Sequence, residues 1–379
     1  GSGVVYPGTG SPLNDLYFAA PWLSSSATSA VTSGAAPKQV PTNPEGKDAQ
    51  TAKLNAPSER NLHPAAPEGG DVTWVSTGRL VDAFTVAGIT QDREGRLFAA
   101  ATTNELNEAN TGRVFRSDDG GDTWGPVVSL PQAWWLESIL MTEDQTLLVG
   151  GMMYDPAETE PVAHAAIYRS QDQGEHWTVA GEWMDTGSVH VLRQRSNGDI
   201  LAGTGPGAMI LVSRDDGQTW ELLPTLPSVE HIHALMETAQ SEVYAGGQRK
   251  GGQGTIHRLT DDTDWEMVEL IDTAASVYAL LESDSVLYAG VAASDGTGRV
   301  HRSMDGGEQW ERSAPLGDSM RVRSLLNDGA GKVYAGLDMG TGQYTSYIYA
   351  SEDQGESWQN SGVLFMADAV YDLFLSSTG

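Results

Sequence analysis

The chain has 379 residues, and its 51 Asp and Glu against 22 Lys and Arg give a formal net charge of −29. Such a surface repels nucleic-acid phosphates and anionic lipids, which argues against both as partners and is typical of proteins that work outside cells. The chain has no cysteine for a disulfide framework, and no apolar run is long enough for membrane insertion.

The first 70 residues differ in composition from the rest of the chain. Residues 1–20 include the apolar segment Val4–Gly8, which has the pattern of a strand. Residues 21–70 are rich in Pro, Ala and Ser, and Ser24–Lys53 has no aromatic residue, so this part cannot bury enough apolar surface to fold alone. We expect an extended arm or an insertion that lies on its own domain. Self-association through residues 21–66 is the alternative.

The motif SxDxGxxW occurs five times in the remaining part, residues 71–379. Its copies begin at Ser117, Ser170, Ser213, Ser303 and Ser351, and they contain Asp119, Asp172, Asp215, Asp305 and Asp353. A sixth, decayed copy runs from His257 to Trp265 and keeps Asp261. Successive Trp residues of the six copies are 53, 43, 45, 45 and 48 positions apart. This period is the length of one four-stranded propeller blade.

The residue types of the motif suit a tight hairpin. Ser and Asp side chains bond nearby backbone N–H groups, Gly supplies a positive φ, and Trp fills the gap between sheets. The run resembles the Asp box, or bacterial neuraminidase repeat, of sialidase-like β-propellers. The resemblance implies a turn between the third and fourth strands, away from the usual active face, and therefore structural Asp residues. Calcium binding by Ser117–Trp124 is the alternative, but one turn offers few converging oxygens, so we expect no metal and no other cofactor.

Each repeat also contains a second strand, recognisable as a short apolar run that ends near Gly or Ala. These runs are Leu97–Ala99, Leu147–Val149, Ile200–Ala202, Val243–Ala245, Leu287–Ala289 and Val333–Ala335. Six complete blades are therefore predicted from about Val81 to Val363.

The two ends of the chain predict one more blade. Val370–Leu373 resembles an innermost strand, Val4–Gly8 a second strand, and Pro67–Trp74 an Asp box without its Ser. Joining them removes free sheet edges, which would otherwise promote aggregation. The predicted fold class is all-β, a single β-propeller with seven four-stranded blades preferred and six as the alternative. In this prediction, strands from both termini close the last blade, although a partner subunit could supply the missing strands instead.

Aligning the innermost strands on their V…L pattern brings one position of every blade together at the central channel. The residues at this position are Ala87, Glu137, His190, His233, Tyr278, Arg323 and Tyr371. Six of the seven are ionisable or phenolic and offer an acid, a base and an anion clamp, so we expect them to be catalytic. The alternative is that the position merely meets water, which tolerates any polar side chain.

Aromatic and acidic residues before the innermost strands suggest a binding rim. They are Trp134 and Trp135 before blade 2, Trp183 and Asp185 before blade 3, and Glu230 before blade 4. We expect the Trp side chains to stack on the apolar faces of sugar rings and the five residues to bind substrate. Packing between sheets is the alternative role for each Trp.

Sialidase chemistry does not fit this sequence. The family resemblance would require an early Arg-Ile-Pro segment and three converging Arg residues, whereas the corresponding segment is Arg79–Val81 and the innermost strands offer Arg323 with Arg321. Xyloglucan-cleaving relatives use two propeller domains, and this sequence predicts one.

Two other reactions fit the ring better. A polysaccharide lyase would use Arg323 to neutralise a uronate carboxylate, His190 or His233 as the base, and Tyr278 or Tyr371 as the acid. A glycoside hydrolase would pair Glu137 with one of three carboxylates, Asp185, Glu230 or Asp372.

The main hypothesis from the sequence is an extracellular Asp-box propeller, secreted or at the cell surface, that binds a glycan or polysaccharide. Cleavage of an acidic polysaccharide by a lyase or hydrolase is an option within it, and whether the protein is an enzyme stays open. The alternative is a non-catalytic structural or interaction subunit of an extracellular or surface assembly.

Overall fold

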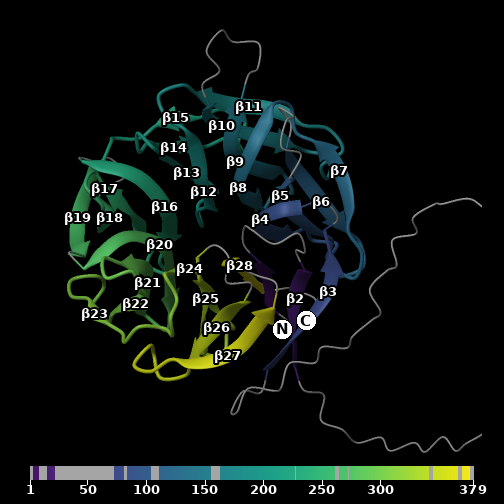
Figure 1. Cartoon of the computed structure of the whole chain (residues 1–379). Helices are drawn as coiled ribbons and strands as arrows, with labels where there is room; N and C mark the ends of the chain where they lie inside the picture. The colour runs from purple at the N-terminus through teal and green to yellow at the C-terminus, as the bar shows by residue number, and fades with distance from the viewer. Residues whose placement is uncertain are drawn as a thin grey trace, which may run out of the picture.

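The computed structural model describes residues 3–7, 15–21, 72–80, 83–103, 111–154, 163–226, 228–260, 264–271, 273–340, 345–365 and 369–375. These residues form seven four-stranded antiparallel sheets, which are arranged as blades in a ring (Figure 1). The prediction of an all-β propeller is therefore confirmed. Within the described ranges, no helix is long and apolar enough to cross a membrane.

Six blades are built from strands that follow one another in the chain, with the first strand innermost. Blade 1 contains β4 (Ala83–Gln91), β5 (Leu97–Thr103), β6 (Gly112–Ser117) and β7 (Gly125–Ser129). Blade 2 contains β8 (Ala133–Met141), β9 (Leu147–Tyr154), β10 (Ala163–Ser170) and β11 (Thr178–Trp183). Blade 3 contains β12 (Ser188–Gln194), β13 (Ile200–Gly205), β14 (Ile210–Ser213) and β15 (Glu221–Leu222).

The next three blades repeat this order. Blade 4 contains β16 (Val229–Glu237), β17 (Val243–Arg249), β18 (Gln253–Thr260) and β19 (Asp264–Ile271). Blade 5 contains β20 (Ala274–Ser283), β21 (Val286–Ala293), β22 (Gly298–Ser303) and β23 (Glu311–Arg312). Blade 6 contains β24 (Arg321–Asn327), β25 (Val333–Asp338), β26 (Thr345–Ser351) and β27 (Gln359–Phe365).

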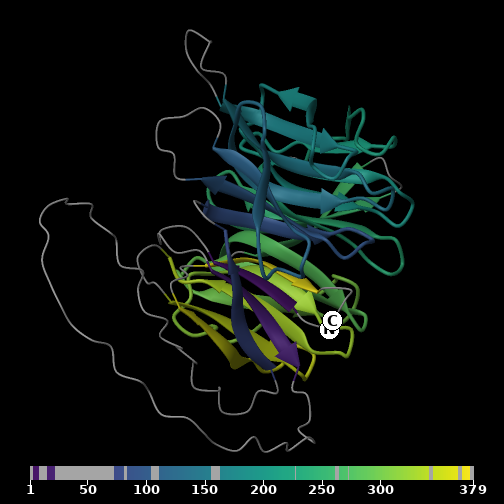
Figure 2. The ribbon, with the colours of Figure 1, turned by 90° about the vertical axis from the view of Figure 1, so that its right-hand side faces the viewer.

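Blade 7 combines the two ends of the chain. Its strand order is β28 (Val370–Leu375), β1 (Gly3–Pro7), β2 (Asp15–Pro21) and β3 (Val72–Arg79). Val4 pairs with Phe374 across β1 and β28, and Ala19 pairs with Trp74 across β2 and β3. Figures 1 and 2 show these purple and blue strands beside the yellow C-terminal strands. The predicted closure of the last blade by both termini is confirmed. The proposed self-association segment, residues 21–66, lies outside the described residues except for Pro21.

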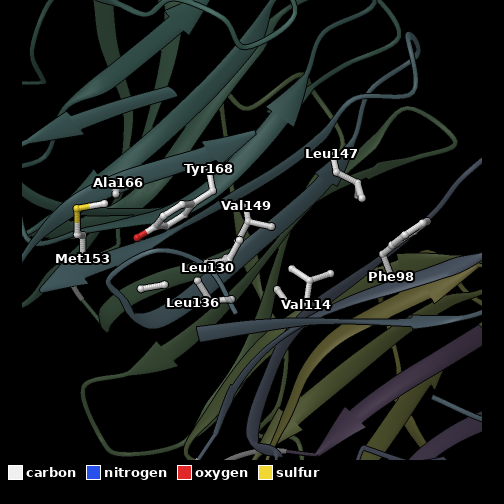
Figure 3. Packing of buried hydrophobic residues seen from close by; sticks show 11 residues of the cluster. Phe98, Val114, Leu130, Leu136, Leu147, Val149, Met153, Ala166 and Tyr168 are labelled. Atoms are coloured by element: carbon white, nitrogen blue, oxygen red, sulfur yellow. The ribbon is translucent and has the colours of Figure 1, made fainter. Parts of the chain in front are cut away.

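The hydrophobic core lies between neighbouring blades. Phe98 and Val114 of blade 1 pack with Leu136, Val149 and Tyr168 of blade 2 in one fully buried cluster (Figure 3). The second strand of a blade is buried along most of its length because it is covered on both faces; β5 and β13 are buried at every residue. This explains why the second strands have continuous apolar runs instead of alternation.

Glycines on the second strands allow the blades to approach closely. A Cβ atom on Gly246 would lie only 2.7 Å from a methyl carbon of Val277 in the next blade. Equivalent contacts of 2.6 to 2.8 Å would occur for Gly150 with Val189, Gly203 with Ile232, Gly290 with Val322, and Gly336 with Val370. The Gly that follows five of the six apolar second-strand runs is therefore required by the apolar residue of the adjacent innermost strand.

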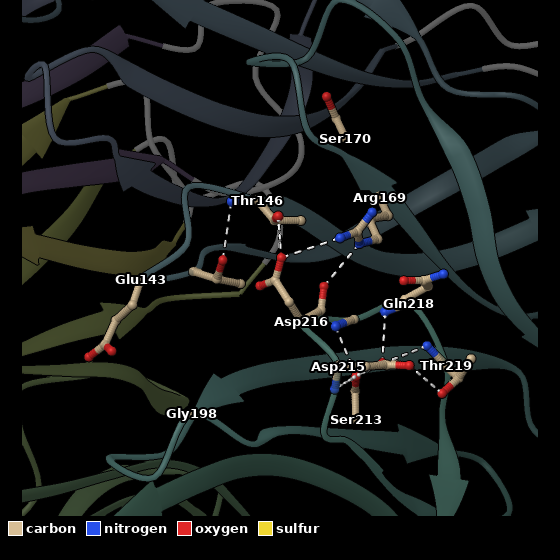
Figure 4. A network of polar contacts seen from close by, with 12 residues as sticks. Glu143, Thr146, Arg169, Ser170, Gly198, Ser213, Asp215, Asp216, Gln218 and Thr219 are labelled. Carbon is tan, nitrogen blue, oxygen red and sulfur yellow. Dashed lines mark hydrogen bonds and ion pairs between the residues drawn. The ribbon is translucent and has the colours of Figure 1, made fainter.

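Each of the five Asp boxes closes the turn between the third and fourth strands of its blade. In blade 3, Gly217 donates its N–H to Ser213 Oγ (2.8 Å), and Asp215 Oδ1 accepts from the amides of Gln218 (3.1 Å) and Thr219 (2.8 Å) (Figure 4). The corresponding Gly-to-Ser bond recurs in the other four boxes at 2.8 to 2.9 Å. The Asp oxygens are thus occupied by their own hairpin. Across the described residues, no group of three or more His, Cys, Asp or Glu could hold a metal ion.

Candidate functional site

The ring position is a β-bulge in the innermost strands. In blade 5, Val277 pairs with Val291 and Ala279 pairs with Gly290, so Tyr278 is left between them without a partner. The same one-residue shift brackets Ala87, Glu137, His190, His233 and Arg323, and the shift in blade 7 encloses Tyr371. A bulge re-aims a side chain and increases the local twist. We call these seven residues the channel ring.

All seven members of the channel ring line two cavities, one on either side of it. The upper cavity, of about 100 Å³, lies toward the starts of the innermost strands and is also lined by Thr85, Trp135 and Leu136. The lower cavity, of about 220 Å³, lies on the other side, where Gly88, Ser324 and Asp372 contribute to its wall. The structure therefore brings together every residue that we expected at the channel, although this placement by itself does not assign them a catalytic role.

Three histidines and Glu137 form one half of the ring. Glu137 Oε2 lies 2.7 Å from His190 Nδ1, and His190 Nε2 lies 3.2 Å from Nδ1 of His231. The His231 and His233 rings are stacked with an interplanar angle of 5°, and the His233 ring centroid lies 4.8 Å from that of Tyr278. His231 precedes the ring position by two residues, and its place in this cluster did not follow from the strand alignment.

The other half is built around Arg323. Its Nε donates to Asp338 Oδ2 (3.1 Å), and its guanidinium lies between the rings of Tyr278 (4.7 Å) and Tyr371 (4.8 Å). Arg321 Nε approaches the same Asp338 oxygen at 3.2 Å. Asp338 ends the second strand β25, and the sequence analysis missed it because it lies 15 residues from Arg323 on a different strand.

These neighbours determine the protonation of the ring. Burial by itself would raise the pKa of Glu137, but His190 lowers it below its ordinary value. Burial and the adjacent His190 lower the pKa of His233 well below its ordinary value, so the imidazole of His233 is neutral at pH 7. Burial by itself would lower the pKa of Arg323, but Tyr371 and Asp338 raise it above its ordinary value. Glu137 is thus an ionised partner of His190 and is unsuited to act as a general acid.

The third carboxylate considered for hydrolysis, Asp372, has a different role. Its Oδ2 accepts a hydrogen bond from the backbone N–H of Ile89 in blade 1 (3.1 Å), and its Oδ1 accepts from that of Leu373 (2.9 Å). Burial raises the pKa of Asp372 to about 6. Asp372 therefore connects the last innermost strand to the first one.

The five residues of the expected binding rim are dispersed. Trp135 lines the upper cavity, and Trp134 lies beside Tyr154 with a centroid distance of 5.6 Å. Trp183 packs edge-to-face on Trp220 at 6.5 Å, which is the gap-filling role. Asp185 is exposed in the turn after β11, and Glu230 lies in β16. Trp134 and Trp135 in β8 and Glu230 in β16 thus belong to strands rather than to loops.

Comparisons with known proteins are consistent with the repeat pattern. A family described as "Photosynthesis system II assembly factor YCF48" matches residues 149–321. The Photosystem II assembly lipoprotein Ycf48 of Synechococcus sp. (strain CC9902) is 28% identical over 213 residues, which are 55% of this chain and 57% of that protein. The chain therefore matches little more than half the length of this curated relative.

Two solved structures have a similar fold at low sequence identity. The GH74 enzyme of Niastella koreensis has a TM-score of 0.56 and 17% identity, over 73% of this chain and 45% of that one. A structure titled "YCF48 bound to D1 peptide" has a TM-score of 0.50 and 16% identity, over 74% of this chain and 82% of that one. With the five Asp boxes in register, these findings show that the chain is a β-propeller of the BNR, or Asp-box, type.

The comparisons correct the functional hypothesis and the expected partner. The family and the curated relative are both named for photosystem II assembly, and the similar solved structure holds a peptide, so the hypothesis of a protein that binds or cleaves a glycan is wrong. The geometry explains why the residue types at the channel suggested an enzyme. Glu137 and Arg323, which looked like an acid and an anion clamp, are paired with His190 and Asp338.

Proposed function

We propose that this protein is a non-catalytic assembly factor that binds a segment of a client protein. This proposal is closer to the alternative from the sequence, a non-catalytic structural or interaction subunit of an extracellular or surface assembly, than to the main hypothesis. The observation that carries the proposal is the match to the photosystem II assembly family over residues 149–321, which extends from β9 in blade 2 to the start of β24 in blade 6. The curated relative, whose name also refers to photosystem II assembly, is 28% identical over 213 residues. The pairing of Glu137 with His190 and of Arg323 with Asp338 also supports a binding role, because these partners engage the groups that the sequence suggested as an acid and an anion clamp.

The upper face of the propeller has the features of a protein-binding surface. Trp134 is 45% exposed at the start of β8, beside Tyr154 at the end of β9. Met320, just before β24, is 42% exposed. Starts of innermost strands and ends of second strands lie on the same face of an antiparallel propeller, so these residues lie on the face toward which the upper cavity is located. Exposed Trp, Tyr and Met are enriched among residues that dominate protein interfaces.

The location of the chain is part of the same proposal. The Synechococcus relative is named a lipoprotein, and a lipid anchor holds a protein at a membrane surface. We therefore place this chain at a membrane surface where a client protein is assembled, which agrees only coarsely with the expected cell-surface or secreted location.

The proposal is tested with a synthetic D1 peptide, labelled for fluorescence anisotropy, and a peptide of the same composition in scrambled order. We expect saturable binding of the D1 peptide and at least tenfold weaker binding of the scrambled one. Trp134→Ala and Met320→Ala should each weaken binding, whereas Met304→Ala should not, because Met304 is 60% exposed in an Asp box on the opposite face. Equal binding of both peptides, or none of either, would contradict the proposal.

A further inference from the structure

The hydrogen bond between His190 and His231 depends on where their protons lie. Glu137 is ionised and can only accept, so His190 Nδ1, which lies 2.7 Å from Glu137 Oε2, is the donor of that bond. His190 Nε2 and His231 Nδ1, which are 3.2 Å apart, must then be one donor and one acceptor. This requirement is met when both rings are neutral or when one of them is charged. When both are charged, two N–H groups face each other and the bond is lost.

The surroundings of this pair balance one positive charge but not two. Among the described residues, the other titratable and charged groups around it are Glu137 in β8, Glu230 and His233 in β16, Tyr278 in β20, Arg321 and Arg323 in β24, Asp338 in β25 and Tyr371 in β28. Asp338 is bound to both arginines, whereas Glu137 contacts an imidazole of the pair. Burial and the neighbouring His190 lower the pKa of His231. A second proton is therefore unfavourable while the bond is intact.

The same bond supports the upper loop of blade 3, residues 205–208, which joins β13 to β14. A Cβ atom on Gly205 would lie 2.8 Å from His190 Nε2 and would clash with His231 Nδ1, so the backbone of Gly205 lies against both nitrogens. Three residues later, Ala208 donates its N–H to the backbone carbonyl of the residue before His231 (3.1 Å). A movement of the His231 ring would therefore disturb both ends of the loop.

We propose that the His190–His231 pair is a pH-sensitive switch that holds this loop at neutral pH and releases it in acid. A proton on the second imidazole breaks the bond, and the His231 ring then turns away from His190. The open arrangement binds one proton more than the closed one, so a fall in pH favours it. The change begins below about pH 6.5, the ordinary pKa of histidine. The switch does not depend on the proposed client protein, because it is a property of the channel and of the loop.

The switch is tested by hydrogen–deuterium exchange of the full chain at pH 7.5 and 5.5, followed by mass spectrometry and corrected for intrinsic exchange rates. Over this range, the charged fraction of a histidine with an ordinary pKa rises from about a tenth to about nine tenths. The upper loop of blade 3 should therefore be about tenfold less protected at pH 5.5. The corresponding loop of blade 5, residues 293–298, should not change, because the ring position of that blade carries Tyr278. Equal protection of the blade 3 loop at both pH values, or an equal loss in both loops, would overturn the proposal.

Three variants separate the effect of protonation from a structural role. His231→Asn places an amide near the position of Nδ1 that can donate or accept without a charge, so the loop should stay protected at both pH values. Glu137→Gln can still accept from His190 but lacks the negative charge, so the loop should open at a lower pH than in the parent protein. His176→Asn is the control and should behave like the parent protein, because His176 is exposed in an Asp box on the opposite face. A loss of protection in His231→Asn as large as in the parent protein, or opening of Glu137→Gln at an unchanged pH, would contradict the proposal.

Discussion

At the scale of single residues, the Asp box shows how one side chain can hold a hairpin. Asp215 is exposed, yet its two oxygens accept from two backbone amides and from the hydroxyl groups of Ser213 (2.9 Å) and Thr219 (2.6 Å). Local bonds from Asp to amides two to four residues later are a common way to fix a turn. The aspartate therefore acts within its own hairpin.

Replacing Asp215 with Ala should reduce the free energy of unfolding by about 1 kcal/mol, because water can satisfy the exposed amides that lose their partner. Urea denaturation of the variant measures this loss. Asp215→Asn is the control and should lose less, since its amide oxygen can still accept from the backbone. A peptide-binding defect with unchanged unfolding would contradict the structural role of the Asp box.

Two buried histidines predict acid sensitivity. Burial lowers the pKa values of His257 and His301 to about 4, with Arg249 and Arg312 adding to the effect. Both histidines stay neutral in the folded protein at pH values between about 4 and 6.5, where the same residues are protonated in the unfolded chain. Stability should therefore decrease as the pH falls from about 6.5 to about 4, by roughly 3 kcal/mol per histidine if the full difference is realised.

The measurement is urea unfolding at pH 8, 6 and 4.5. The double variant His257→Phe and His301→Phe should show a flatter pH dependence than the parent protein. Phenylalanine is a suitable replacement because Phe115 occupies the equivalent place in the third strand of blade 1. An identical pH profile in the double variant would show that other groups control acid unfolding.

At the scale of strands, blade spacing depends on the second-strand glycines. Gly246→Ala would place a methyl group 2.7 Å from Val277 and 3.3 Å from Leu280, which are residues of the adjacent innermost strand. Overpacking of this kind costs about 1–3 kcal/mol. Thermal or urea unfolding should show this loss for Gly246→Ala.

The control for this change is Gly125→Ala, because a Cβ atom there would have no heavy atom within 4 Å. Adding Val277→Ala to Gly246→Ala should recover part of the lost stability, since it removes the clashing methyl groups. If the two changes were simply additive, the proposed contact between the blades would not be the cause.

At the scale of the whole molecule, the ring is closed by β28. This strand pairs with β1 on one side, and Asp372 joins it to Ile89 of blade 1 on the other. Without β28, the edge of β1 that pairs with it would be left open, and open sheet edges promote aggregation. Closure from both ends of the chain therefore couples the first and last blades.

Truncation before Val370 should lower Tm and increase aggregation, because it removes the innermost strand of blade 7. Truncation after Leu375 keeps this strand and is the control. Differential scanning calorimetry with light scattering measures both properties. If the shorter chain melted like the control, closure by β28 would not contribute to stability.

Much of this architecture could be predicted from the sequence. The Asp boxes and the apolar second strands are local patterns that recur once per blade, so they predicted the propeller, its blade boundaries and the innermost strands. The V…L alignment also predicted which residues share the channel, because each lies at the same bulge of a repeated strand. These features could be predicted because the blades repeat: equivalent positions of each blade pack in the same way and therefore carry similar residue types.

The chemistry of the channel was decided only by the tertiary structure. Glu137 and His190 come from adjacent blades and are 53 residues apart in the chain, and Arg323 meets Asp338 across two strands. The sequence showed six polar residues at one position but not which of them neutralise one another, because these contacts depend on the angles between blades and on side-chain rotamers. The same six residues therefore suggested an enzyme when considered singly. In the folded protein Glu137 pairs with His190 and Arg323 pairs with Asp338, and the one short side chain of the channel ring, Ala87, lies in the same wall.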